Sequence, residues 1–394
     1  MKKHTSYAAA ASYAIGFLYI CCFLFGFYGD VHKTWHPLLF AAVFTLWGLY
    51  TLEKPLDPAR LPYLVCMLLT ALAAALGLCR ATYGWSTLAL HGFAVCWVLS
   101  GESWDESWIC LLANGLRGVF LTPFQYFFLR EKTLFSALRG KVPGKGNRKL
   151  LLSSVAAVVL SLPLFLLAGN LLGQADKSFQ ALTQGFLSFF RLDVPQWVGS
   201  FLIRFLFGLP VGAYLYGMMA GSRKALPQAL REKNHGLFPC RTIQWILGAF
   251  IGLYLLFFAA QANTLLAVFR NQVPGKLTAS AYARSGFFQL CQVMAINFLL
   301  VGLGNLLTKD PRRLVLPCQI LMVQSIFLAV SAAGKLLLYI RRFGFTPLRL
   351  LSFWAVLVLT AGCLMVIATL RRKKNTLRLW LWFSSFTFTA LCFY

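Results

Sequence analysis

The stretch LRLLSFWAVLVLTAGCLMVIATL, residues 348–370, has one charged residue, Arg349, among apolar and weakly polar side chains. An α-helix rises about 1.5 Å per residue, so a run of about 20 apolar residues crosses the hydrocarbon core of a bilayer. Inside lipid, only helices and closed barrels satisfy their own backbone hydrogen bonds. This stretch therefore indicates a transmembrane helix.

Runs of the same kind occupy most of the 394 residues. Hydrophobic residues make up 59% of the chain and charged residues 12%, with a mean hydropathy of +0.69. A soluble domain is nearer half apolar and a quarter charged. We therefore expect an all-α polytopic integral membrane helix bundle with about eleven transmembrane helices. The expected spans are residues 8–28, 37–52, 61–79, 83–100, 150–173, 198–221, 242–262, 286–307, 314–334, 348–370 and 377–394.

One further apolar segment, residues 104–130, does not read as a clean span. Acidic residues lie at its start, and Arg117 and Pro123 interrupt it. We expect an interfacial or re-entrant helix on the cytoplasmic side, followed by a basic loop, residues 130–149. The stretch GKVPGKGNR, residues 140–148, is the expected linker between an N-terminal group of spans, residues 1–149, and a C-terminal bundle, residues 150–394.

Basic residues predict the orientation of the chain. The formal net charge is +26, yet the basic residues lie in short loops between apolar runs, and no basic module typical of nucleic-acid binding is present. Four alternate loops, from residue 130 onward, hold nineteen Lys and Arg, and the loops between them hold nine. The positive-inside rule then places the N terminus inside and the C terminus outside. We expect a multi-pass protein of the bacterial cytoplasmic membrane.

Several functional classes find no support in the sequence. The cysteines lie singly inside apolar runs, apart from Cys21–Cys22, which is typical of small buried hydrophobic residues and not of a zinc site or disulfide framework. No catalytic, nucleotide-binding or metal-binding motif occurs, so no catalytic residue, cofactor or metal is expected. All eleven carboxylates fall in loops or at span ends, which argues against a cation-coupled pump.

Polar residues at helical spacing point to a site at the outer ends of two spans. Tyr282, Ser285, Gln289 and Gln292 form one stripe, and Gln324, Ser331, Lys335 and Arg342 form another. A polar stripe is costly against lipid, so we expect both to face the bundle interior. Two simpler explanations remain open, snorkelling of the basic side chains to headgroups and hydrogen bonds between helices. The candidate vestibule residues are Asp176, Tyr282, Arg284, Gln289, Gln292, Lys335, Tyr339, Arg341 and Arg349.

Three motifs resemble a bacterial multi-pass membrane family known only as domain of unknown function 4173, with 4153 as a sibling. They are LLGQADKSFQAL at residues 171–182, YARSGFFQL at 282–290 and LLLYIRRFGFTPLRL at 336–350, and the resemblance covers roughly the C-terminal 240 residues. Lys335 and Phe345 depart mildly from the expected arginine and leucine. The resemblance brings no known activity. The positions of this chain that match the family motifs are Asp176, Phe179, Tyr282, Arg284, Gly286, Phe287, Tyr339, Gly344, Thr346 and Arg349.

These features favour a non-enzymatic function, the binding, passage or sensing of an anionic or lipid-like ligand at an outward-facing polar site. The expected partners are the lipid bilayer and an anionic lipid or small anion. One alternative is an integral-membrane enzyme acting on an envelope lipid or phosphate-bearing precursor, with Asp176 as base and Arg284 or Arg349 holding the phosphate. Another is an assembly partner of a second membrane protein.

Overall fold

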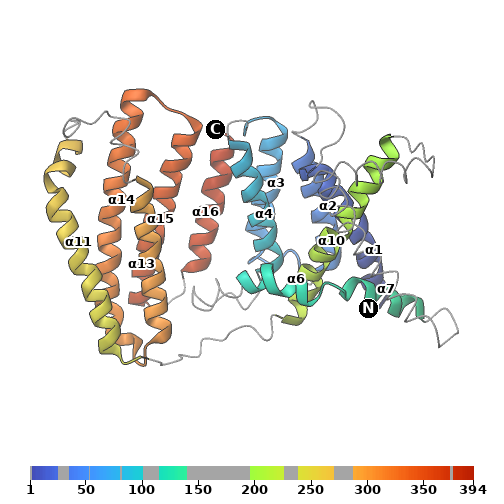
Figure 1. Ribbon diagram of the computed structural model, residues 1–394, viewed down its shortest axis with the longest axis horizontal. Helices are drawn as coiled ribbons and strands as arrows, with labels where there is room; N and C mark the ends of the chain where they lie inside the picture. Colours follow the sequence, from blue (N-terminus) through green and yellow to red (C-terminus); the bar gives the residue numbers. More distant parts are fainter. Residues whose placement is uncertain are drawn as a thin grey trace, which may run out of the picture. The chain divides into compact units, whose positions relative to one another are not determined.

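The computed structural model describes residues 2–24, 35–52, 54–79, 82–100, 115–139, 196–225, 238–269, 287–372 and 376–394. Within these ranges every regular element is a helix, which confirms the all-α fold class (Figure 1). Six helices are long and apolar enough to cross a membrane. They are Ser6–Leu24, Val198–Ser222, Cys240–Ala262, Phe287–Leu307, Pro311–Phe343 and Pro347–Arg371.

The other expected spans have different outcomes. Two coincide with shorter apolar helices, His36–Thr51 and Leu61–Ala75. Two more coincide with Tyr83–Leu99 and Leu377–Cys392, of 17 and 16 residues, and the span at 150–173 lies outside the described residues. The total of eleven spans and their orientation therefore stay predictions.

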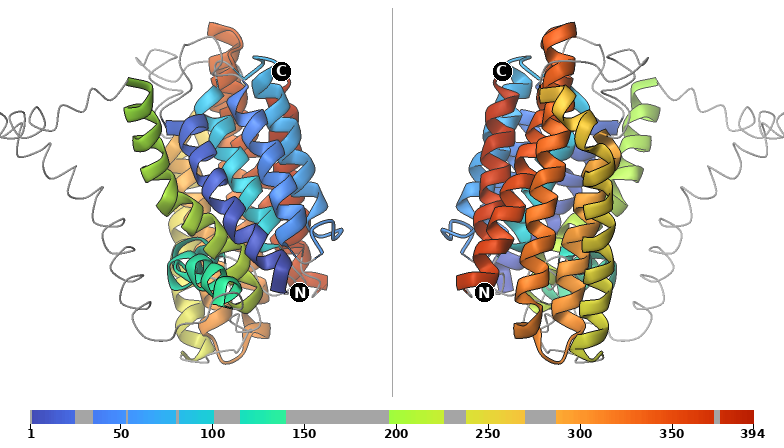
Figure 2. Two further views of the ribbon diagram at one scale, coloured as in Figure 1. Left: turned by 90° about the vertical axis from the view of Figure 1, so that its right-hand side faces the viewer. Right: turned by 90° about the vertical axis from the view of Figure 1, so that its left-hand side faces the viewer.

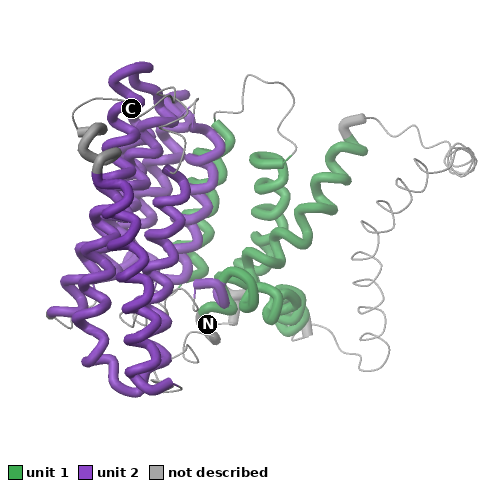
Figure 3. Tube along the Cα trace, turned by 60° about the vertical axis from the view of Figure 1, so that its left-hand side comes forward, with its two compact units in different colours: residues 1–53, 119–225 green, residues 54–118, 226–394 purple. Residues whose placement is uncertain are grey.

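The helices form two compact units, each built from two stretches of chain (Figure 3). Unit 1 comprises Met1–Glu53 and Val119–Ala225, and unit 2 comprises Lys54–Gly118 and Leu226–Tyr394. Both units draw on both sides of the expected boundary between residues 149 and 150, and the boundary itself lies outside the described residues.

Unit 1 is organised around two helices that pack closely at glycines. They are α1 (Lys2–Tyr19), which continues into a π-helical turn at Ile20–Leu24, and α10 (Gln196–Ala225). A Cβ added at Gly208 would lie 2.7 Å from the backbone nitrogen of Phe17, and one at Gly212 would lie 2.2 Å from the carbonyl oxygen of Ser12. The Gly208/Gly212 spacing, with two small residues four positions apart, permits this close approach of the helices.

The remaining helices of unit 1 are short, apart from α2 (His36–Thr51). A π-helical turn at Arg117–Leu121 leads into α6 (Thr122–Gln125) and then α7 (Leu129–Arg139). Figure 2 shows α7, in teal, running across the direction of α1 and α10. None of these pieces is long enough to span a bilayer, and the prediction of a membrane-surface helix in this region stays a prediction.

The start of the expected basic loop needs correction. Residues 130–139 belong to α7 and are not a loop, and Arg130 is 4% exposed. The reason is that Arg130 finds polar partners inside unit 1, which a count of basic residues cannot reveal.

In the part of unit 2 that the structure describes there are seven α-helices. Two come from the N-terminal stretch, α3 (Leu61–Ala75) and α4 (Tyr83–Leu99). In the C-terminal stretch α13, α14, α15 and α16 follow one another as antiparallel hairpins (Figure 1). The helices of that stretch are α11 (Cys240–Phe269), α13 (Phe287–Leu307), α14 (Val315–Phe343), α15 (Pro347–Arg372) and α16 (Leu377–Cys392).

Contacts inside unit 2 fix the relative directions of its helices. The amide of Gln244 in α11 donates to the carbonyl oxygen of Arg313 before α14, and Gln324 of α14 donates to Ile251, so α11 and α14 run in parallel. Because α14–α15 and α15–α16 are both antiparallel pairs, α16 runs parallel to α14. Thr70 contacts Thr389, and further along both segments Cys79 contacts Cys392, so α3 runs parallel to α16. Since α4 returns antiparallel to α3, it ends on the side where α11 begins.

If α4, α10 and α11 each cross the membrane, this arrangement requires an even number of crossings between α4 and α11. With α10 as one of them, one more would be needed, and the span predicted at residues 150–173 would supply it. This parity agrees with the predicted arrangement in which residues 104–130 do not cross.

The predicted orientation can be tested by labelling single cysteines introduced into a cysteine-free background. Lys145→Cys and Gly236→Cys should be protected from a membrane-impermeant maleimide added outside intact cells, because both loops carry the cytoplasmic excess of Lys and Arg. Lys276→Cys should react. Labelling at 145 and 236 with protection at 276 would reverse the orientation.

Candidate functional site

The corner between α14 and α15 brings together several residues of the third motif. Gly344 ends α14 with a φ of 79°, and its N–H donates to the carbonyl oxygen of Ile340 at 2.8 Å. Glycine suits this position because it adopts positive φ without steric cost. Pro347 then opens α15, where the N–H groups of Arg349 and Leu350 donate to Thr346 at 3.0 and 3.1 Å.

Arg349 stabilises the corner between α14 and α15. Its guanidinium lies 4.3 Å from the ring centroid of Tyr339 and donates to the carbonyl oxygens of Phe343, at 2.8 Å, and Gly344. A cation that satisfies the last carbonyls of a helix also interacts favourably with the helix dipole. Tyr339, Gly344 and Arg349 therefore share a structural contact, a role that the sequence did not reveal.

The other candidate residues on α14 are Lys335, which is half-buried, and Arg341, which is exposed like its neighbour Arg342. No carboxylate among the residues the structure describes forms an ion pair with Arg341 or Arg342. Asp176, Tyr282 and Arg284 lie outside the described residues, so their place in the candidate vestibule and the enzyme alternative stay predictions.

The two polar stripes differ in what they face. Gln324 and Ser331 of α14 are each 6% exposed and face the interior of unit 2, as expected for their stripe. Gln289 and Gln292 of α13 are exposed, and because residues 270–286 before this helix lie outside the described residues, their place in a vestibule stays a prediction. The buried polar residue of α13 is Asn297, which is fully buried and lies on a different face of the helix.

Asn297 lies at the centre of a polar network joining three helices. The hydroxyl of Tyr254 in α11 donates to Asn297 Oδ1 at 2.7 Å, and Asn297 Nδ2 donates to Ser325 Oγ of α14 at 2.8 Å. Ser325 in turn donates to the carbonyl oxygen of Leu321 at 2.9 Å. Asn297 is the central residue of the candidate span Phe287–Leu307, so the network lies near mid-span. Buried hydrogen bonds of this kind specify how transmembrane helices pair.

Gln324 joins the same helices beside this network. Its Nε2 donates to the carbonyl oxygen of Ile251 at 3.1 Å, which fixes the orientation of the amide because a carbonyl cannot donate. The side-chain oxygen of Gln324 is buried and accepts no hydrogen bond from the residues the structure describes.

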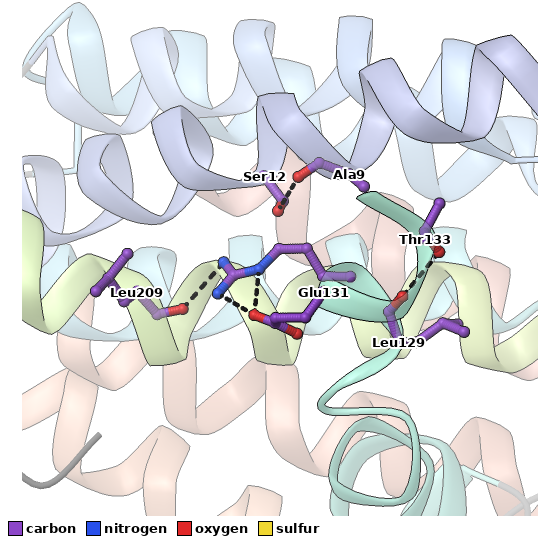
Figure 4. A network of polar contacts seen from close by, with 7 residues as sticks. Ala9, Ser12, Leu129, Glu131, Thr133 and Leu209 are labelled. Carbon is purple, nitrogen blue, oxygen red and sulfur yellow. Dashed lines mark hydrogen bonds and ion pairs between the residues drawn. The ribbon is translucent and has the colours of Figure 1, made fainter. Parts of the chain in front are cut away.

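Unit 1 has a charged cluster between α1, α7 and α10 (Figure 4). Arg130 Nε and Nη2 donate to Glu131 Oε1 at 2.9 and 2.7 Å, and Nη1 donates to the carbonyl oxygen of Leu209 at 3.2 Å. The guanidinium also lies 3.9 Å from the ring centroid of Tyr13. Glu131 Oε2 is buried and accepts no hydrogen bond from the described residues.

This cluster corrects one inference from the sequence. Leu209 lies near the centre of the candidate span Val198–Ser222, and Tyr13 near the centre of Ser6–Leu24. Glu131 therefore sits beside the middle of two candidate spans, although its position in the sequence suggests a loop. The absence of a mid-span carboxylate can no longer be used against cation coupling.

Comparison with protein families matches residues 63–394 to the family described as "Domain of unknown function (DUF4153)". The chain belongs to this family. The match falls on the sibling that the motifs suggested and not on family 4173, and it extends further toward the N terminus than the C-terminal 240 residues. No curated protein and no solved structure matches the chain. Any function of this DUF4153 member must therefore be argued from its own residues.

Weak signals in the sequence could have pointed to the polar residues that were not among the candidates. Asn297 is an amide in the middle of an apolar run, a position that is costly unless the side chain is paired inside the bundle. Arg130 and Glu131 are adjacent opposite charges directly after the apolar stretch FQYFFL. Neither signal names a partner, since Tyr254, Ser325, Tyr13 and Leu209 come from distant segments.

Proposed function

We propose that this membrane protein binds an anionic, lipid-like ligand at the corner between α14 and α15. The observation that carries the proposal is the exposed pair Arg341–Arg342, which lies in the last turn of α14 with no carboxylate partner among the described residues. Arginine forms strong charge-assisted hydrogen bonds with phosphate and carboxylate groups. By the predicted orientation this corner faces outward.

Exposed apolar side chains surround the arginine pair. Phe343 and Phe345 are each 50% exposed and Leu348 is 55% exposed, while the ring of Phe345 contacts that of Tyr394 at a centroid distance of 5.8 Å. Charged and apolar groups side by side suit a ligand with an anionic head and an apolar body.

The length of α14 supports a position at the headgroups. The candidate span Pro311–Phe343 has 33 residues. At about 1.5 Å per residue it is about 50 Å long, against about 30 Å for the hydrocarbon core. At least one end of the helix must therefore rise into the headgroup region.

The opposite end of the same helix provides a natural comparison. It also carries two adjacent exposed arginines, Arg312 and Arg313, but there Arg313 Nε contacts Asp310 Oδ2 at 2.9 Å. The positive charge is thus partly neutralised at one end of α14 and not at the other. A specific anion site is expected only at the Arg341–Arg342 end.

Binding of short-chain phosphatidylglycerol to the detergent-solubilised protein tests the proposal. Wild-type protein should bind it more tightly than phosphatidylcholine, and the double substitution Arg341→Gln/Arg342→Gln should weaken binding about tenfold or more. The reason is that each basic residue contributes about 1 kcal/mol near an anionic lipid surface.

The matched control is Arg312→Gln/Arg313→Gln, which removes the same charge from the other end of α14. It should leave phosphatidylglycerol binding within about twofold of wild type. Equal weakening by both double substitutions would mean that only net charge matters, and the proposed site would be wrong.

A further inference from the structure

We propose that Cys79 and Cys392 form a disulfide bond that joins the end of α3 to the end of α16. The Sγ atom of Cys79 lies 3.3 Å from the carbonyl oxygen of Cys392, so the thiol of one cysteine contacts the backbone of the other. Each residue is 2% exposed.

The two helices meet along their length in the same direction. Thr70 and Thr389 share a hydrogen bond at 3.3 Å between their hydroxyl oxygens, and the cysteine pair follows at the far end of the same interface. Ser86, at the start of α4, lies near the Cys79 thiol. The pair is thus held on both sides by helices of unit 2.

The predicted orientation places this end of the interface outside. With the N terminus inside, the span at 61–79 is the third, and with the C terminus outside the span at 377–394 is the last. Both therefore end at the outer surface, in agreement with the parallel packing of α3 and α16. Disulfides form and persist in oxidising compartments outside the cytoplasm.

The other described cysteines are placed differently. Cys21 and Cys22 are neighbours in the π-helical turn of α1, and Cys66 and Cys363 are buried beside hydroxyl groups of Thr389 and Ser325. Cys79 and Cys392, by contrast, are in contact across two distant segments of the chain. The single buried cysteines keep the structural role that the sequence predicted for all of them.

The chemistry needs an external oxidant of a common class. The two S–H bonds break, one S–S bond forms, and two electrons and two protons pass to the disulfide of a thiol oxidoreductase in the outer compartment, which is reduced to two thiols. Because both cysteines become buried, this exchange takes place before α16 has packed against α3.

The bond would link residues 313 positions apart in the chain. Cross-links that close long loops restrict the unfolded chain most strongly. It would also hold the end of α16 beside α3 and α4. Reducing agent should therefore lower the melting temperature of the wild-type protein and leave that of Cys79→Ser unchanged.

The test uses membranes from cells with an oxidising outer compartment, quenched in acid and alkylated with N-ethylmaleimide in denaturant. Wild-type protein should carry two fewer adducts than the same protein reduced first, and digestion should yield a peptide pair joined through Cys79 and Cys392. Cys79→Ser and Cys392→Ser should each abolish the difference, while the control Cys66→Ser should retain it.

Full alkylation of both cysteines without reduction would overturn the proposal. A second treatment, with the oxidant copper phenanthroline on isolated membranes, then shows why no disulfide was found. Cross-linking only under this treatment would mean that the thiols are adjacent but are not joined in the cell. No cross-linking at all would mean that the contact between α3 and α16 is wrong.

Discussion

Replacing Gly212 by alanine should destabilise unit 1 by about 3 kcal/mol, the upper part of the range for overpacking a close contact. The new Cβ would lie 2.2 Å from the carbonyl oxygen of Ser12, and this oxygen belongs to the backbone of α1, so no side-chain rotation can relieve the clash. The helices α1 and α10 would have to separate, with loss of the contacts at Gly16 and Gly208. The free energy of unfolding, measured by denaturant titration in detergent, checks this.

The matched control is Gly252→Ala in α11. A Cβ at Gly252 meets no atom within 4 Å, so the substitution should be neutral or stabilising, because alanine favours the helix by up to about 1 kcal/mol. Similar values for Gly212→Ala and Gly252→Ala would mean that α1 and α10 are not in backbone contact.

This comparison also shows what a sequence spacing can predict. Gly208/Gly212 and Gly248/Gly252 have the same spacing, and both suggest a surface on which another helix can pack closely. The structure finds α1 against Gly208 and Gly212, whereas a Cβ added at Gly248 or Gly252 would meet no other side chain or helix within 4 Å among the described residues. The spacing reports that an approach is possible. It does not report which helix approaches.

The fold class and the helix positions were predictable because they depend on local properties of the chain. An apolar run of 20 residues forms a helix in lipid whatever its neighbours are, so the expected spans in the described residues coincide with helices. The short pieces, the π-helical turn Arg117–Leu121, α6 and α7, were not predictable in the same way. Their boundaries depend on contacts with α10, such as the hydrogen bond from the hydroxyl of Tyr214 to the carbonyl oxygen of Val119 at 2.8 Å.

For the candidate site, the direction in which polar side chains face was predictable on α14 but not on α13. The stripe on α14 has Gln324 and Ser331 facing inward because α14 is covered on that side by α11, α13 and α15. For α13, the same reasoning selected Gln289 and Gln292, yet the helix presents Asn297 to the interior. A helical period gives the faces of a helix but not which face the neighbours cover, and that depends on pairings between distant segments.

Apart from substitutions such as Gly212→Ala that create a backbone clash, Arg130→Met should lower the free energy of unfolding of unit 1 the most. The guanidinium donates to Glu131 and Leu209 and covers the ring of Tyr13, all within a side chain that is 5% exposed. Methionine keeps much of the volume but leaves the Glu131 carboxylate buried without its donors. Removing one partner of a buried ion pair costs about 3–5 kcal/mol, since the remaining charge is uncompensated.

The double substitution Arg130→Met/Glu131→Gln separates the charge from the packing. Glutamine removes the uncompensated charge, so the double variant should recover a part of the lost free energy of unfolding, and the coupling between the two positions should exceed about 1 kcal/mol. The control is Arg313→Met, which breaks the ion pair between Arg313 and Asp310. The side chain of Arg313 is 72% exposed and that of Asp310 is 44% exposed.

An exposed pair of that kind contributes at most about 1 kcal/mol. Equal effects of Arg130→Met and Arg313→Met would place Arg130 in a polar environment. A large effect of Arg130→Met with full coupling to Glu131 would place the carboxylate in a low-dielectric site beside the middle of α1 and α10. Glu131 would then be a mid-span ionisable group, and ion or proton coupling, which its place in the sequence argues against, would have to be measured directly.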